Sequence, residues 1–132
     1  MADDNSTPSP LQWVRTADFA DVYANNVRFE SSVWDLKSVF GVLDQGTPNN
    51  VAIPPSVRFH TAIAVPWVQA KIMAYNMYLN VMFHEHTDGT IKIPASVMPP
   101  SLETLIPTMA ETPEGRQLIE RDKKLRADLF GE

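Results

Sequence analysis

The stretch that most constrains this chain runs from residue 57 to residue 85, where an alternating segment passes through one proline into a long apolar segment. Between 57 and 65 every second position is apolar or threonine, which is the pattern of a half-buried strand. Pro66 cannot donate to a sheet but suits the first turn of a helix, so a helix is expected to start there. The side chains predicted on the inner face of the strand are Val57, Phe59, Thr61, Ile63 and Val65.

The predicted helix, 67–83, is apolar around most of its circumference. Its polar positions form one narrow stripe, made of Gln69, Asn76, Asn80 and His84. One small sheet cannot cover so much apolar surface, and a second copy of the chain is the simplest further cover. The sequence therefore predicts a homo-oligomer, most simply a dimer. The expected subunit contact consists of Trp67, Met73, Met77, Tyr78, Leu79 and Val81.

The composition is that of a soluble globular protein, with 44% hydrophobic and 20% charged residues in 132. A net charge of -5 argues against a broad phosphate-binding surface, which clustered Lys and Arg would have to build. With zero cysteines the chain has no disulfides, thiolate metal ligands or catalytic thiol, and it fits a reducing cytoplasm. The first ten residues lack the basic start and apolar run of a signal peptide, so we expect a cytoplasmic protein.

The rest of the pattern predicts an α+β fold in three parts. Residues 1–10 are expected to be a disordered tail, 11–93 an α+β core domain, and 94–132 a proline-rich segment with a C-terminal helix. The core would be an antiparallel three- to four-stranded β-meander packed on the long helix. Its expected strands are 23–30, 33–43 and 57–65, with a turn at Ser31-Ser32, a loop at 44–56 and optional short strands at 11–14 and 91–93. Its expected solvent face carries Arg28, Glu30, Asp35, Lys37, Arg58 and His60.

The C-terminal helix is predicted to begin at Thr112-Pro113-Glu114, where Thr caps, Pro occupies the first position and Glu favours the positive helix end. A short helical turn is expected at 101–106. The apolar stripe of the C-terminal helix would contain Leu118, Leu125 and Leu129 with Ile119 beside them, and its expected ion pairs are Glu120 with Lys124 and Asp122 with Arg126.

His84-Glu85-His86 is the one compact set of metal-capable side chains. Residues two apart point in different directions on a helix, and a zinc-hydrolase pattern needs His at i and i+4. If the helix ended before His86, the two imidazoles could converge with His60 or Asp88. Otherwise these His residues sit near a helix C-terminus, where positive charge is favoured. We therefore assign no metal, cofactor or catalytic residue, and read Lys71 as an exposed ammonium on an apolar stem.

Across residues 21–93 the chain resembles a family of short bacterial and archaeal proteins classed as a domain of unknown function. The matching features are Asp21-Val22-Tyr23-Ala24-Asn25, Trp34-Asp35-Leu36, Phe40-Gly41, the strand 58–65, Pro66, Ala70-Lys71, Asn80, Glu85 and Gly89 leading to Ile91. The chain departs from the family pattern at Trp67, where the family more often has a polar residue, and continues past it after Ile93. The resemblance implies a strand meander followed by a long helix, with no established activity. In architecture alone, the layout is similar to the SecB export-chaperone family, which oligomerises and holds unfolded chains in apolar grooves.

These features favour a non-enzymatic oligomeric binding or scaffold protein. Its ligand would be a protein segment held on a sheet edge or in an apolar groove. Two alternatives stay open. One is a small hydrolase or other metal-dependent enzyme using His84, His86 and His60, and the other is a nucleic-acid-associated regulator using Arg28, Lys37 and Arg58.

Overall fold

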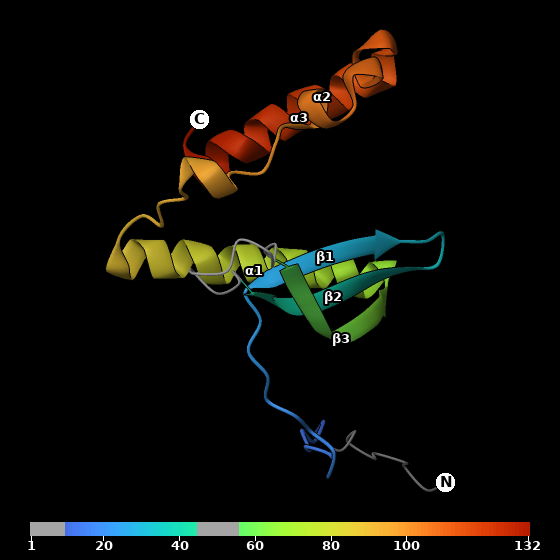
Figure 1. The fold of residues 1–132 in the computed structure, drawn as a ribbon, viewed down its shortest axis with the longest axis vertical. Helices are drawn as coiled ribbons and strands as arrows, with labels where there is room; N and C mark the ends of the chain where they lie inside the picture. The colour runs from blue at the N-terminus through green and yellow to red at the C-terminus, as the bar shows by residue number, and fades with distance from the viewer. Residues whose placement is uncertain (1–9, 45–55) are drawn as a thin grey trace, which may run out of the picture. The chain divides into compact units, whose positions relative to one another are not determined.

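A computed structural model of the chain describes residues 10–44 and 56–132 (Figure 1). The strands are β1 (Asn26–Ser31), β2 (Asp35–Asp44) and β3 (Ser56–Pro66), and the long helix is α1 (Trp67–Asp88). The C-terminal part contains η1 (Ala95–Val97), α2 (Leu102–Leu105), η2 (Pro107–Glu111) and α3 (Pro113–Phe130). The α+β class is confirmed. Residues 1–9 of the predicted tail and 45–55 of the predicted loop lie outside the described residues.

The chain divides into two compact units between Met73 and Ala74, inside α1. In the first unit, the described strands form one antiparallel sheet in the order β1-β2-β3. The optional fourth strands are wrong, because 11–14 and 91–93 are not in strands. A turn follows the first of these segments, where Phe19 N–H donates to Thr16 O at 3.1 Å. The second is held at the end of α1, where Ile91 N–H donates to Glu85 Oε1 at 3.0 Å.

A bulge in β3 changes which side chains share a face of the sheet. Phe40 is opposite Thr61 but Gly41 is opposite Phe59, so His60 is the extra residue. Side chains on either side of a bulge change faces, because cross-strand partners lie on the same face. The prediction that 57, 59, 61, 63 and 65 share one face is therefore wrong. Val57 and Phe59 lie on the face of Lys37, while 61, 63 and 65 lie on the face of Ser38.

The bulge also corrects the predicted charged face. Glu30 is opposite Lys37 and Arg28 is opposite Val39, so these charges do share one face, as expected. Arg58 is opposite Val42, which places it on the other face. There it forms an ion pair with Asp44 at 3.6 Å. One face of the sheet thus carries Arg28, Glu30, Asp35 and Lys37, and the other is mainly apolar.

Ser32 holds the hairpin between β1 and β2. Its Oγ accepts the N–H groups of Trp34 at 3.1 Å and Asp35 at 3.0 Å, and donates to Asp35 Oδ1 at 2.7 Å. We expect Ser32→Ala to lower the free energy of unfolding by about 1 to 2 kcal/mol, because two backbone donors lose their acceptor. Chemical denaturation of Ser32→Ala beside Ser31→Ala measures this. Equal stability of the two variants would contradict it.

Pro66 couples the sheet to the helix as predicted. It is opposite Asp35 in the last β3 pair, and α1 begins at the next residue without a loop. The indole Nε1–H of Trp67 then donates to Ser32 O at 3.0 Å, which ties the first turn of α1 to the hairpin. The helix continues to Asp88, five residues beyond the predicted 83, because nothing breaks it before Gly89. Gly89 has a φ of 97° and its N–H donates to Glu85 O, as a C-terminal glycine does.

The second unit begins α3 as predicted. Thr112 Oγ1 accepts Gly115 N–H at 3.0 Å, and Pro113 occupies the first turn. The predicted short helix is present as α2, where Ser101 Oγ accepts Thr104 N–H at 3.3 Å. Asp122 Oδ2 accepts Leu102 N–H at 2.8 Å and so links α3 to the start of α2. The sequence pattern predicts the Thr112 cap and the short helix, but not the Ser101 cap or the contact of Asp122 with Leu102.

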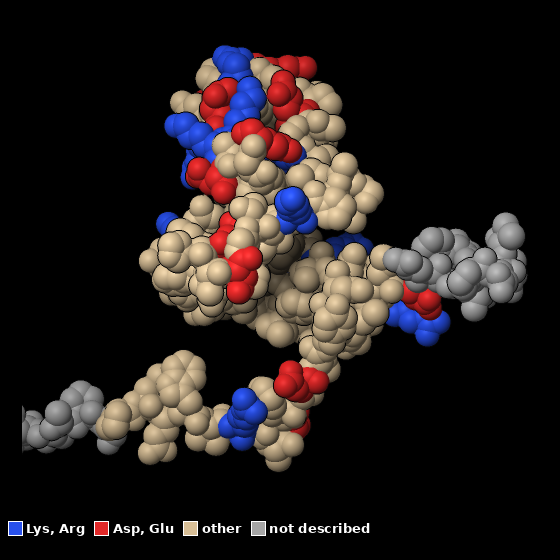
Figure 2. Space-filling view, turned by 90° about the vertical axis from the view of Figure 1, so that its left-hand side faces the viewer, with Lys and Arg blue, Asp and Glu red and all other residues tan. Residues whose placement is uncertain are grey.

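Of the predicted side-chain pairs of α3, Glu120 with Lys124 is wrong. The hydrogen bond with Glu132 raises the pKa of Arg126, and the charge of Asp122, its predicted partner, adds to that rise. Lys123, not Lys124, contacts Glu120, at 3.2 Å. Arg126 bonds both oxygens of Glu132 at 2.7 and 2.8 Å, and its Nη1 donates to Pro99 O at 2.8 Å. The buried part of the apolar stripe of α3 is also narrower than expected. Ile119 is buried, whereas Leu118 and Leu125 are about half exposed. Figure 2 shows Lys, Arg, Asp and Glu crowded over the C-terminal helices, where their charges face solvent.

Candidate functional site

Exposed apolar side chains are the main feature of the described residues. Only Ala70 and Ile119 are buried among the hydrophobic residues of 10–44 and 56–132. Soluble monomers rarely leave so much apolar surface uncovered, so these residues are candidates for contacts with another molecule.

α1 carries a long run of these apolar side chains. Lys71 is the single Lys, Arg, Asp or Glu between residues 67 and 83. Ala70 is the one buried residue of the helix. Of the predicted contact residues, Met77 is 64% exposed and Leu79 is half-buried. The other predicted contact residues are also exposed or half-buried, namely Trp67, Met73, Tyr78 and Val81. The helix therefore keeps an apolar surface that a partner could cover.

The apolar face of the sheet contains a second candidate surface. Phe29, Ser38 and Ile63 lie opposite one another across β1, β2 and β3. Ser38 is buried, whereas Phe29 is 61% and Ile63 50% exposed. The row thus puts a small side chain between two large apolar ones, and we call it the Phe29–Ile63 row. The sequence did not reveal it, because it depends on the pairing of three separate strands.

Two strand edges border this face. In the described sheet β2 is central, so β1 and β3 each have one side that bonds no other described strand. β3 has 11 residues and β1 has 6, so β3 is the longer edge. Unpaired backbone groups on a sheet edge can accept an added strand.

Two of the three candidate metal residues, His84 and His60, make contacts within the chain. His84 Nδ1 lies 3.1 Å from Asp88 Oδ2, one helical turn away. His60 contacts Tyr23 O through Nε2 at 3.0 Å and Thr61 Oγ1 through Nδ1 at 2.7 Å. His86 is exposed on the last turn of α1. Within 10–44 and 56–132 no three His, Cys, Asp or Glu side chains form a group able to hold a metal ion.

The three basic residues of the nucleic-acid hypothesis do not form a common patch. Arg28 and Lys37 both contact Glu30, at 3.8 Å each. Arg58 lies on the opposite face and contacts Asp44. Each cation thus has an acidic neighbour, and the sheet offers no row of cations for phosphate groups.

Among the described residues, two carboxyl groups have a lowered pKa. A hydrogen bond from Arg126 lowers the pKa of Glu132, which keeps this carboxylate charged beside the guanidinium. A hydrogen bond from the Thr16 hydroxyl lowers the pKa of Asp18. Both shifts favour the charged carboxylate, and neither creates a proton donor near neutral pH.

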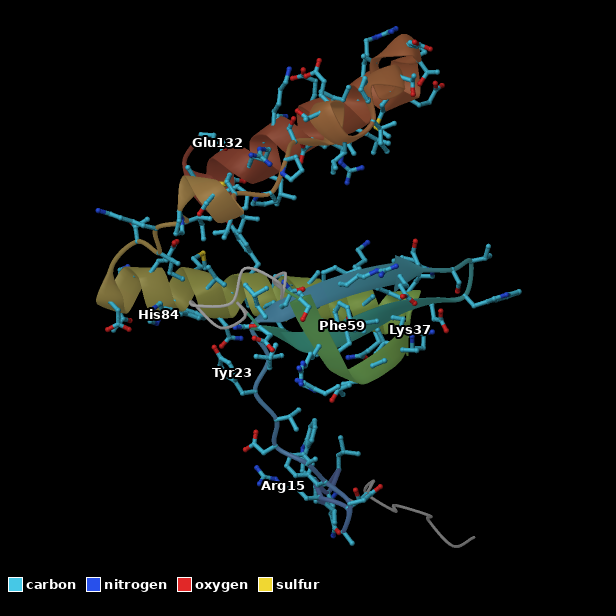
Figure 3. All side chains as sticks on the ribbon, viewed as in Figure 1. Arg15, Tyr23, Lys37, Phe59, His84 and Glu132 are labelled. Atoms are coloured by element: carbon cyan, nitrogen blue, oxygen red, sulfur yellow. The ribbon has the colours of Figure 1, made fainter. Side chains whose placement is uncertain are left out.

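The segment before β1 is a further candidate contact surface. The sequence pattern predicts only an optional short strand there. Leu11, Trp13 and Val14 are 78%, 91% and 80% exposed. Figure 3 shows Tyr23 close to the sheet and Arg15 away from it. An apolar segment that leaves its own sheet is a further surface for contact with another molecule.

No helix in the described ranges is both long and apolar enough to span a membrane. No protein-family description, curated protein or solved structure matches this chain. The resemblance to the family of unknown function therefore stays a prediction. The candidate surfaces are supported by the geometry of this structure alone.

Proposed function

We propose that this chain is a non-enzymatic oligomeric binding or scaffold protein, with α1 at the subunit contact. The observation that carries the proposal is that most large apolar side chains of the described residues are exposed, and that Ala70 and Ile119 alone among the described hydrophobic residues are buried. Burial of apolar surface is the main driving force for folding and for association. Because so few apolar residues are buried in the single chain, most of the free energy from apolar burial would be gained when copies associate.

The second part of the proposal concerns the ligand, which would be an unfolded or extended protein segment. The Phe29–Ile63 row supports this, because its exposed apolar side chains lie on the two strands that form the sheet edges. An extended segment could pair with an edge through its backbone and place side chains against this row. That mode gives affinity through main-chain bonds and little dependence on sequence.

A binding experiment tests this ligand class. The probe is a fluorescently labelled, reduced and carboxymethylated polypeptide that cannot fold, and its anisotropy is followed as the full chain is added. We expect binding by the natural chain and roughly 10-fold or greater weakening in Phe29→Ser/Ile63→Ser, because two large apolar contacts are lost.

Val33→Ser is the matched control, since Val33 is 85% exposed but lies at the hairpin tip outside the row. Sedimentation of all three proteins shows whether assembly is unchanged. Absence of probe binding by the natural chain, or equal binding by the double variant, would remove the proposed ligand.

A further inference from the structure

One face of α1 has apolar residues at alternating spacings of four and three. The face consists of Val68, Ile72, Tyr75, Leu79 and Met82, and His86 continues the spacing. A repeat of seven residues with two apolar positions is the pattern by which one helix packs along another. We call these residues the α1 seam.

The seam lies on the side of α1 away from its buried residue. At about 100° per residue, Ala70 is roughly opposite Val68, Tyr75 and the rest of the seam. Val68 is 76% and Tyr75 64% exposed, so the seam is open in the single chain. From Val68 to His86 it is about 27 Å long, enough for a two-helix contact.

The charges beside the seam select an orientation for a partner helix. Lys71 and Glu85 occupy equivalent places in the heptad, each one residue before a seam position. In an antiparallel pair, residues in such places face one another across the contact. Aligning Ile72 with Met82 of the second copy brings Lys71 next to Glu85 of that copy, and the two-fold axis repeats the pair.

The parallel arrangement lacks this complementarity. In a parallel pair, Lys71 would instead lie next to Asn76 of the second copy, and Asn76 carries no charge. The antiparallel alignment also puts Asn76 opposite Asn76 and Tyr78 opposite Tyr78 at the two-fold axis. Glu85 Oε1 accepts Ile91 N–H at 3.0 Å, and its second oxygen can accept from Lys71 of the other copy.

We infer that the α1 seam binds the α1 seam of a second copy in antiparallel orientation, with paired Lys71–Glu85 contacts at its flanks. This inference rests on the proposed function and specifies its subunit contact. A second copy is favoured over another protein because it supplies both the apolar stripe and the opposite charge at matching places.

Single cysteines in this cysteine-free chain test the inference. Ile72→Cys and Met82→Cys chains with different tags are oxidised separately and as a mixture. We expect a shift to the mass of two chains in the mixture alone, with both tags in the product. Ala74→Cys is the control, because Ala74 is exposed, lies outside both the seam and the predicted subunit contact, and is expected to stay at the mass of one chain.

The outcomes separate the inference from the proposed function. Crosslinking of Ile72→Cys with itself would mean a parallel pair and overturn the orientation. Oligomers in sedimentation without any seam crosslink would overturn the seam but leave the proposed function standing. Monomers at all concentrations would overturn both.

Charge reversal gives an independent measurement. Lys71→Glu and Glu85→Lys are each expected to weaken association roughly 10-fold, since two attractive pairs become repulsive. The double variant is expected to regain most of the loss, as is an equimolar mixture of the two single variants. Failure of this rescue would show that the two residues do not meet across copies.

Discussion

Leu79→Asp is expected to weaken association of the chain by at least about 100-fold, equivalent to roughly 3 kcal/mol. Leu79 is central in the α1 seam and half-buried even in the single chain. A carboxylate there would be enclosed by apolar side chains of a second copy with no partner for its charge. Sedimentation velocity over a range of protein concentrations would report the loss as a shift toward the monomer.

Ala74→Asp is the matched control for this variant. It adds the same residue to the same helix, but Ala74 is exposed and lies outside both the seam and the predicted subunit contact. We therefore expect a much smaller effect on association, with similar helix content by circular dichroism. Equal loss in both variants would indicate that partners surround α1, as its apolar circumference alone predicts.

Gly115→Ala is expected to disrupt the C-terminal unit, with a loss of more than about 3 kcal/mol in its stability. A Cβ on Gly115 would lie 1.7 Å from Met109 O and 2.7 Å from Met109 C. These are backbone atoms of η2, so no side-chain rotation can relieve the overlap. Thermal unfolding and limited proteolysis within residues 94–132 would measure the loss.

Gly89→Ala provides the comparison for a glycine without a close neighbour. Gly89 has a φ of 97° and no heavy atom within 4 Å of a Cβ built on it. Its substitution is expected to cost only about 1 to 2 kcal/mol, which is the penalty of a left-handed conformation for alanine. A Gly115→Ala protein as stable as Gly89→Ala would mean that η2 does not pack on α3 as described.

The sequence alone determined the features that depend on neighbours along the chain. Pro66 marks the change from strand to helix and Thr112 caps α3, both as predicted, and Gly89 ends α1 five residues beyond the predicted end. Each follows from local physics, because a missing N–H, a capping hydroxyl and a left-handed φ act within a few residues. The apolar circumference of α1 was likewise visible as a pattern, and the structure leaves that surface exposed.

Only the tertiary structure decided which distant residues meet. The bulge at His60 reversed the faces of Arg58 and Phe59, and it arises in the pairing of β3 with β2. Arg126 forms hydrogen bonds to Glu132 and Pro99 in addition to its charge interaction with Asp122, because folding of the second unit brings separate segments together. Residue spacing describes one strand or helix at a time, whereas cross-strand register and helix contacts depend on the whole arrangement of the chain.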